Sequence, residues 1–224
     1  MFDLHTHSLF SDGALVPSEL VRRAIVQGYE AIAITDHVDF TNIEFVLSNL
    51  KKAEPADLTD RAITVIRGVE LTHIPPGKLE KLALKAKALG AELVVVHGET
   101  LAEPVARGTN RAAVNIPAVD ILAHPGLITD EDAARAKENG IYLELTSRKG
   151  HCLANGHVAA VARRVGADML LNTDTHAPED LITDELGARI LAGAGLTPEA
   201  VMTVMEKNPR TVLQHLMQGG LQHV

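Results

Sequence analysis

The chain is poor in cysteine and in aromatic residues. A single cysteine, Cys152, stands among 224 residues, so an intramolecular disulfide framework is excluded and a reducing compartment fits. We therefore expect a cytoplasmic protein. Aromatic residues make up only 3% of the chain and tryptophan is absent. The core must then be built from Val, Ile, Leu and Ala, which suits a parallel sheet covered by helices.

Positive charge and long apolar runs are also scarce. The chain carries 21 Lys and Arg against 29 Asp and Glu, a formal net charge of -8 at pH 7. This balance argues against a general affinity for nucleic acid or anionic membranes. We therefore expect no extended nucleic-acid groove. A local basic patch is compatible with the same net charge. No apolar stretch is long enough to span a bilayer and no signal peptide is recognised, so we expect no membrane association.

The apolar residues that are present follow a regular pattern. They make up 46% of the chain, ample for one core, and the length predicts a single domain over residues 1–224. Helical patterns alternate with short apolar runs, which indicates βαβ units and a parallel α/β barrel. The strand-like runs lie at about 2–7, 31–36, 63–70, 92–97, 119–124, 141–146 and 168–174.

Several helix boundaries can be predicted from their end signals. Pro17 opens a helix that Gly28 closes, and Thr129 is a candidate N-cap for a helix ending at Gly140. Further helices are expected over 78–89, 156–165 and 197–207. We expect Asn208-Pro209 to break the last of these before a final helix over 210–217.

Side chains that commonly bind metals follow most of these runs. In parallel α/β folds, residues just past the carboxyl ends of the strands build the active site. The pattern therefore predicts a metal centre at the mouth of the barrel. The nine candidate ligands are His5, His7, Asp12, His37, Glu70, His97, His124, Asp174 and His176.

The first ligand pair has the spacing of a strand. His5 and His7 are two residues apart, so both imidazoles point to the same side of a strand, and Asp12 follows in a Ser-Asp-Gly turn that can fold back toward them. Mixed imidazole and carboxylate ligands suit Zn²⁺, Mn²⁺ or Fe²⁺. One such pair is a weak signal. However, six of the eleven histidines fall at predicted strand ends, which chance placement would not produce.

The motifs HTHSLFSDG, TDH, GVE, VVVH, AHPG and TDTH, in this order, resemble the polymerase-and-histidinol-phosphatase (PHP) family. The resemblance covers the chain from His5 to Asn208-Pro209. It implies a distorted barrel of seven β/α units that binds three divalent metal ions. By position, one site would use His5, His7, Glu70 and Asp174, a second Asp12, His37 and His176, and a third His97 and His124 with Glu70 as a bridge. Some relatives have His where this chain has Asp12, so the metal there can differ.

Other candidate residues have a structural alternative. Asp36 is a candidate partner that orients a ligand imidazole, or else a turn former or helix cap. Arg148, after the sixth run, is a candidate grip for a phosphate group, with Lys149 and Arg107 as weaker candidates; solvated loop charges are the alternative.

The remaining chemistry-bearing residues have weaker signals. We interpret His73 as a loop residue in preference to a ligand, and Cys152 as a small apolar filler. His151 and His157 flank Asn155-Gly156 after the sixth run, which makes them candidates for a substrate pocket.

The resemblance implies metal-dependent hydrolysis of a small phosphate monoester, and histidinol phosphate is the substrate it suggests first. Bridged metals activate water and stabilise charge on phosphoryl oxygens, which is the chemistry this reaction needs. The alternative is a nuclease-type phosphoesterase acting on short oligonucleotides or nucleoside bisphosphates. A non-catalytic binding subunit is the third reading, and the intact ligand set argues against it.

Overall fold

The apolar runs that precede the candidate ligands form a parallel sheet. The computed structural model describes residues 1–52, 55–58 and 63–220. Seven strands lie at the seven predicted runs, and the short β3 adds an eighth. The strands are β1 (Phe2–Thr6), β2 (Ala31–Ile34), β3 (His37–Val38), β4 (Thr64–Leu71), β5 (Leu93–His97), β6 (Ile121–Ala123), β7 (Tyr142–Thr146) and β8 (Met169–Asn172).

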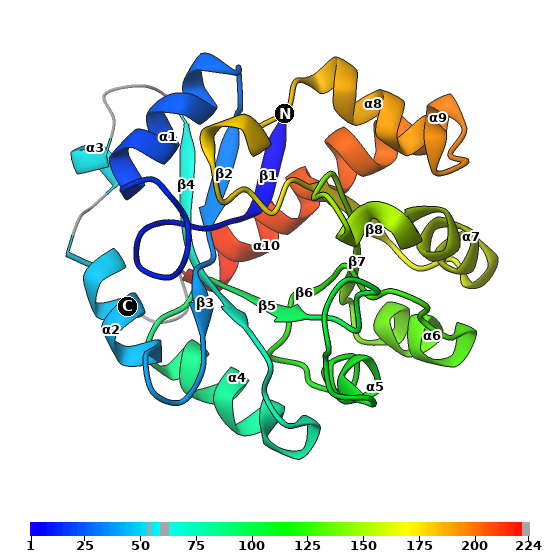
Figure 1. Ribbon diagram of the computed structural model, residues 1–224, viewed down its shortest axis with the longest axis horizontal. Coiled ribbons are helices and arrows are strands. Elements are labelled where there is room, and N and C mark those ends of the chain that lie inside the picture. The colour runs from blue at the N-terminus through cyan, green and yellow to red at the C-terminus, as the bar shows by residue number, and fades with distance from the viewer. Residues whose placement is uncertain (53–54, 59–62, 221–224) are drawn as a thin grey trace.

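The sheet curves into a nearly closed barrel. Its order is β1-β2-β4-β5-β6-β7-β8 with every pair parallel, and β3 pairs with the far end of β4. The first and last strands of this order come together just past β1 and β8. There the His7 N–H donates to the Thr175 carbonyl at 2.8 Å, and the Asp174 N–H donates to the His5 carbonyl at 3.0 Å. The predicted distorted α/β barrel is confirmed (Figure 1).

The helices surround the strands (Figure 1). They are α1 (Pro17–Val26), α2 (Ile43–Leu50), α3 (Pro55–Leu58), α4 (Leu79–Ala88), α5 (Thr109–Ala113), α6 (Asp130–Glu138), α7 (Asn155–Val165), α8 (Asp184–Gly193), α9 (Pro198–Met202) and α10 (Asn208–Gly220). Short 3-10 turns η1 (Pro76–Lys78), η2 (His151–Ala154) and η3 (Pro178–Asp180) and the π-helical turn η4 (Thr203–Lys207) complete the elements. Thr129 caps α6 as predicted, since its hydroxyl accepts from the Asp132 N–H at 3.1 Å.

The predicted break at Asn208-Pro209 is wrong. Helix α9, the π turn η4 and helix α10 follow one another without a gap. Proline lacks an N–H, and its ring clashes with the carbonyl four residues earlier in a regular α-helix. The wider η4 turn directly before Asn208 relieves this conflict, because a π turn shifts the hydrogen-bond pattern there. The Asn208 side chain also donates to the Met169 carbonyl at 2.8 Å, which fixes this segment against β8.

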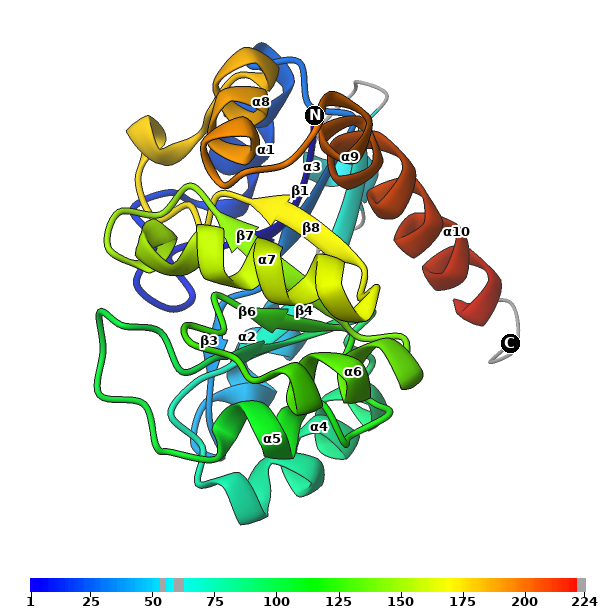
Figure 2. The ribbon, with the colours of Figure 1, turned by 90° about the vertical axis from the view of Figure 1, so that its right-hand side faces the viewer.

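The two ends of the barrel differ in polarity. Inward-facing apolar side chains of the strands pack against Val212, Leu213 and Leu216 of α10. Helix α10 therefore covers one end of the barrel, opposite to the long loops (Figure 2). The apolar interior consists of Leu4, Ala33, Ile66, Leu93, Val95, Ile121, Ala123 and Leu170. The polar centre lies at the other end, where the strands finish. Among the described helices, none combines the length and apolarity needed to cross a bilayer.

Candidate metal centre

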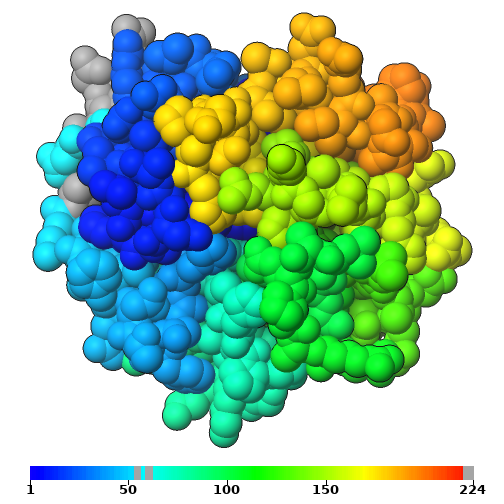
Figure 3. All heavy atoms as spheres, viewed as in Figure 1, coloured from blue at the N-terminus to red at the C-terminus, as the bar shows by residue number. Residues whose placement is uncertain are grey.

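The structure brings all nine predicted ligands together at the carboxyl ends of the strands. They come from β1, β3, β4, β5 and the segments that follow β1, β6 and β8. Figure 3 views this end of the molecule, where segments coloured blue, yellow and green meet around a small opening. His5, His7 and Glu70 are fully buried, whereas Asp12, His37 and His176 line the open side.

The first predicted set has spacings that a metal ion requires. Four ligands placed about 2.0–2.1 Å from a tetrahedral metal lie about 3.3–3.4 Å from one another. His5 Nε2 lies 3.3 Å from Glu70 Oε1, and His7 Nε2 lies 3.1 Å from Asp174 Oδ1. The remaining His5–Asp174 and His7–Glu70 distances are 3.8 and 3.7 Å. His5, His7 and Asp174 therefore form one group with metal-ligand spacing. Glu70 lies beside this group, with Oε1 near His5 and Oε2 near His7.

The second predicted set is equally tight. The Nε2 atoms of His37 and His176 are 3.4 Å apart. Asp12 Oδ1 lies 3.6 Å from His37 Nε2 and 3.3 Å from His176 Nε2. The carboxylate of Asp12 is 58% exposed, so this set faces solvent.

The third predicted set contains His97 and His124. Their rings are 4.5 Å apart in an edge-to-face arrangement, and His124 Nε2 lies 3.6 Å from Glu70 Oε1. Glu70 also contacts His37 Nδ1 at 2.6 Å, so its carboxylate touches a member of each of the three sets. Burial alone would raise the pKa of Glu70, but His5, His37 and His97 hold it well below its usual range. A carboxylate in this position is charged and can bridge cations.

Buried polar atoms without partners show that the centre fits metal ions. In the described part of the chain, six buried side-chain atoms lack a hydrogen-bond partner. Leaving one such atom unsatisfied costs about 1–3 kcal/mol, a cost that coordination to a cation removes. The atoms are His5 Nε2, His7 Nδ1, His7 Nε2, Glu70 Oε1, His124 Nδ1 and Asp174 Oδ1. All belong to predicted ligands, so the residues present fit a group of divalent metals.

The backbone is unusual at the same place. Among the described residues other than glycine, only His73, His124 and Asp174 have positive φ angles, at 53°, 28° and 54°. Such conformations cost about 1–3 kcal/mol and gather at functional sites. Two of the three are predicted ligands, so the fold accepts local strain in order to aim them.

Comparison with known proteins identifies the family of this chain. Residues 3–116 match the family model described as the PHP domain. An uncharacterized protein of Methanocaldococcus jannaschii is 52% identical over 217 residues, covering 96% of this chain and 99% of that protein. The chain belongs to the PHP family.

More distant relatives extend the comparison. A probable phosphatase of Caldanaerobacter subterraneus subsp. tengcongensis is 24% identical over 241 residues, covering 96% of this chain and 91% of that protein. A chain in the structure of archaeal ribonuclease P with mature tRNA superposes with a TM-score of 0.70 at 14% identity, covering 96% of this chain and 91% of that chain. At this identity the second match supports the fold alone.

Sequence reasoning missed a carboxylate that supports this PHP centre from behind. Glu144 of β7 is fully buried, and its Oε1 lies 2.8 Å from His5 Nδ1. Its Oε2 accepts the backbone N–H of His124 at 3.0 Å, and Asn172 donates to Oε1 at 2.8 Å. Such a partner fixes the tautomer of the ligand imidazole, so that the other nitrogen faces the metal. A charged residue inside the apolar run 141–146 was the signal that could have revealed it.

Asp36 has the contacts of a turn former. Its carboxylate accepts from the N–H and the hydroxyl of Ser8 at 2.8 and 2.7 Å, and from the Ser11 hydroxyl at 2.7 Å. These bonds hold the turn that carries Asp12. A side chain at Gly13 would lie 2.3 Å from the His7 carbonyl, so the turn requires glycine there. The contacts match the turn-former alternative for Asp36, and through this turn Asp36 also positions Asp12.

The three basic candidates differ in their surroundings. The Arg148 guanidinium donates to Asp180 at 2.8 Å. The same Asp180 oxygen accepts the backbone N–H groups of His176 and Ala177 at 2.9 and 2.8 Å, so Arg148 supports the loop of a ligand. Lys149 and Arg107 have exposed side chains. Binding of phosphate by any of them stays a prediction.

The other singled-out residues also find their places. His157 Nε2 bonds to the Ile128 carbonyl at 2.8 Å, a structural contact, and Cys152 is half-buried. His151, in contrast, stacks on His124 with ring centroids 4.2 Å apart. His73 stacks on His97 at 5.2 Å. His73 therefore lies beside the third set, closer to the centre than a loop residue needs to be.

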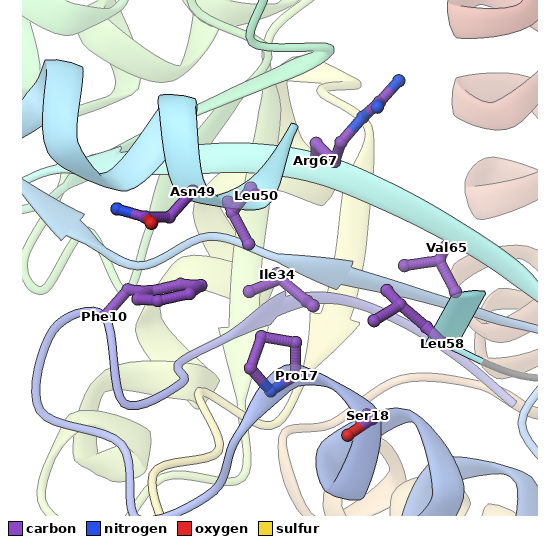
Figure 4. Close-up of a pocket in the computed structure, with 9 residues that line it drawn as sticks. All are labelled: Phe10, Pro17, Ser18, Ile34, Asn49, Leu50, Leu58, Val65 and Arg67. Atoms are coloured by element: carbon purple, nitrogen blue, oxygen red, sulfur yellow. The ribbon is translucent and has the colours of Figure 1, made fainter. Parts of the chain in front are cut away.

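An apolar pocket of about 210 Å³ lies elsewhere on the molecule. It sits between α1, α2 and the outer faces of β2 and β4 (Figure 4), where Phe10, Ile34, Leu50 and Val65 are among the lining residues. The described residues that line it include none of the predicted ligands. The pocket is therefore separate from the PHP centre.

Proposed function

We propose that this PHP-family protein is a metal-dependent phosphoesterase that hydrolyses a small phosphate monoester. The observation that carries the proposal is the complete nine-ligand set, with Glu70 in contact with all three of its groups. The relative named a probable phosphatase, which aligns over nearly the whole chain, supports the same reaction class.

The chain's own residues suit three divalent cations. Zn²⁺, Mn²⁺ and Fe²⁺ are the ions whose preferred ligands match these imidazoles and carboxylates. When bound, such cations lower the pKa of water and neutralise charge on phosphoryl oxygens. His5, His7 and Glu70, all buried, keep water away from the inner side. Asp12, His37 and His176 are 58%, 24% and 13% exposed, so a phosphate group would enter from their side.

The chemistry of the surface favours a small substrate. The net charge of -8 opposes the approach of a long polyanion, and the chain has few aromatic side chains for stacking bases. Arg107 and Lys149 are exposed, so the net negative charge does not oppose the approach of a small phosphate group near these two side chains. Histidinol phosphate is our first candidate, and a nuclease-type activity on short oligonucleotides or nucleoside bisphosphates is the alternative.

A metal-loaded preparation tests the proposal. We expect about three equivalents of metal per chain by elemental analysis, and release of phosphate from p-nitrophenyl phosphate that a chelator abolishes. A panel of phosphorylated metabolites, short oligonucleotides and nucleoside bisphosphates then ranks the substrates. Asp174→Asn should lose activity, whereas His157→Asn, outside the centre, should retain it. At most one metal in an active preparation would refute the three-metal centre, and preferred cleavage of oligonucleotides would favour the alternative.

A further inference from the structure

The loop between β5 and α5 brings a carboxylate to the centre that is not among the nine predicted ligands. Residues 98–108 form the long green loop that precedes α5 on the open side of the barrel (Figure 2). Glu103, within this loop, points its carboxylate at three imidazoles. Oε2 lies 3.2 Å from His97 Nε2 and 3.4 Å from His73 Nε2, and Oε1 lies 3.4 Å from His151 Nε2.

These distances have the spacing of ligands around one ion. A tetrahedral shell places its members about 3.3–3.4 Å apart. His97 uses its Nδ1 toward the Gly98 carbonyl at 3.2 Å, which leaves Nε2 as the metal-facing atom. Glu103 is the carboxylate next to that atom. Two groups with metal-ligand spacing also include these residues, one formed by His73, His97 and Glu103 and one by His97, His124 and His151.

The loop that carries Glu103 is anchored at both ends. The Glu99 carboxylate accepts the N–H groups of Gly108 and Asn110 at 3.0 and 2.9 Å. The Asn110 amide donates to the Pro125 carbonyl at 2.7 Å, and Gly126 packs so closely that a side chain there would lie 1.9 Å from the Glu99 carbonyl. The loop is thereby fixed to the segment that follows His124.

A second contact aims the neighbouring imidazole. His151 Nδ1 lies 2.7 Å from the Thr100 hydroxyl in the same loop, so its Nε2 is directed toward Glu103. His97, His124 and His151 are all buried. Glu103, in contrast, is 40% exposed. The carboxylate therefore lies on the solvent side of the third set, where a substrate would arrive.

We propose that Glu103 is an exchangeable ligand of the metal held by His97 and His124. Glu103 reaches that set through His97, the residue shared by the two groups with metal-ligand spacing. The predicted ligands of that metal are only His97, His124 and the shared Glu70, so a carboxylate beside His97 can add a fourth. His73 and His151 hold the carboxylate from both sides. Because Glu103 is partly exposed while Glu70 is buried, an oxygen of a phosphate group can replace Glu103 and leave the bridge intact. The inference rests on the metal centre of the proposed function and adds a position at which that centre exchanges ligands.

The test compares Glu103→Gln with Glu131→Gln, a surface carboxylate paired with Arg111. Each protein is titrated with Co²⁺ while visible absorption and a competing chelator report the affinity of each site. For Glu103→Gln we expect two ions bound as in wild type and a third held about tenfold or more weakly. Glu103→Asp keeps the charge but has a shorter side chain, so its affinity for the third ion should lie between those of wild type and Glu103→Gln. Inorganic phosphate should bind the three-metal form of Glu103→Gln more tightly than wild type, since it displaces no carboxylate.

The outcomes separate this inference from the proposed function. Wild-type affinity for all three ions in Glu103→Gln would overturn the role of Glu103, while three ions in wild type would leave the phosphoesterase proposal standing. Failure of the wild-type protein to bind Co²⁺ at all would overturn both. Thermal unfolding of the metal-free proteins checks that the variants fold.

Discussion

Replacement of Glu144 by Gln changes a single buried oxygen and tests how the centre is held. The carboxylate accepts from the His5 ring and Asn172 on Oε1 and from the His124 N–H on Oε2. Glutamine keeps the size but offers one oxygen and one NH₂ group. In either orientation the NH₂ group faces a donor. Asn172 cannot turn to help, because its own oxygen accepts the Leu4 N–H at 2.9 Å.

The effect on metal binding can be worked out from these contacts. If the glutamine NH₂ faces His5, the ring must accept at Nδ1 and carry its proton on Nε2, the nitrogen that a metal needs. If it faces the His124 N–H, a buried donor loses its acceptor, at a cost of about 1–3 kcal/mol. Loss of such outer partners typically lowers metal affinity about 10- to 100-fold, which corresponds to about 1.4–2.7 kcal/mol. We expect this loss at the site that contains His5.

Competition with a chelator of known affinity measures the change, with one site followed at a time in the metal-loaded protein. Glu138→Gln is the matched control, since Glu138 is an exposed carboxylate paired with Arg135 on α6. The control should bind metal as wild type does. Affinity of Glu144→Gln within about twofold of wild type at every site would refute the reasoning, because the tautomer of His5 would then not depend on Glu144.

Three further predictions follow from the centre. Glu70→Gln should lower metal content at more than one site and reduce turnover, as elemental analysis and phosphate release would show; loss at one site alone contradicts a bridge. In the metal-free protein, Glu70 raises the pKa of His37 to about 9 against the effect of burial. The stability from this pair should be complete below about pH 6.5 and lost as pH rises through about 9; urea unfolding that shows constant or rising stability across that window contradicts it. Arg148→Ala should cost about 2–4 kcal/mol in kcat/KM if the guanidinium grips phosphate. Because Asp180 also links Arg148 to the His176 loop, metal content must be measured alongside, and a near-normal kcat/KM excludes the phosphate role.

The sequence predicts the parts of this fold that depend on short patterns. A buried parallel strand needs a run of apolar residues, and the ligands stand where each run stops. A residue that directly follows an apolar run can therefore be placed at the carboxyl end of the barrel from the sequence alone. His5 and His176 are far apart in the sequence, yet both could be placed at one end because the strands are parallel.

The parts that were missed depend on long-range contacts. Glu103 lies in a loop of ordinary composition, and its contact with His73 and His151 arises from how three loops fold over β5. Helices α2, α3, α5 and α8 were not predicted either. Helices α3 and α5 are short, and α2 begins without a side-chain cap. Helix α8 does carry a capping signal that could have revealed it, because the Thr183 hydroxyl accepts from the Leu186 N–H at 3.2 Å. The helix continues across Asn208 because of a π turn, which the local preferences of the amino acids do not predict.

The closure of the barrel has a consequence for how the protein holds together. Other neighbouring strands share runs of paired residues, whereas β1 and β8 share none in the described sheet. The chain just past β8 instead joins β1 through an isolated bridge between Thr6 and Thr175. Contacts across this seam join positions as much as 170 residues apart, as in the hydrogen bonds from Thr173 to Asp3. A cation shared by His5, His7 and Asp174 would act there as a cross-link, and the entropy of closing so long a loop makes that link valuable. Removal of the metal should therefore make the protein unfold first along this seam, between β1 and β8.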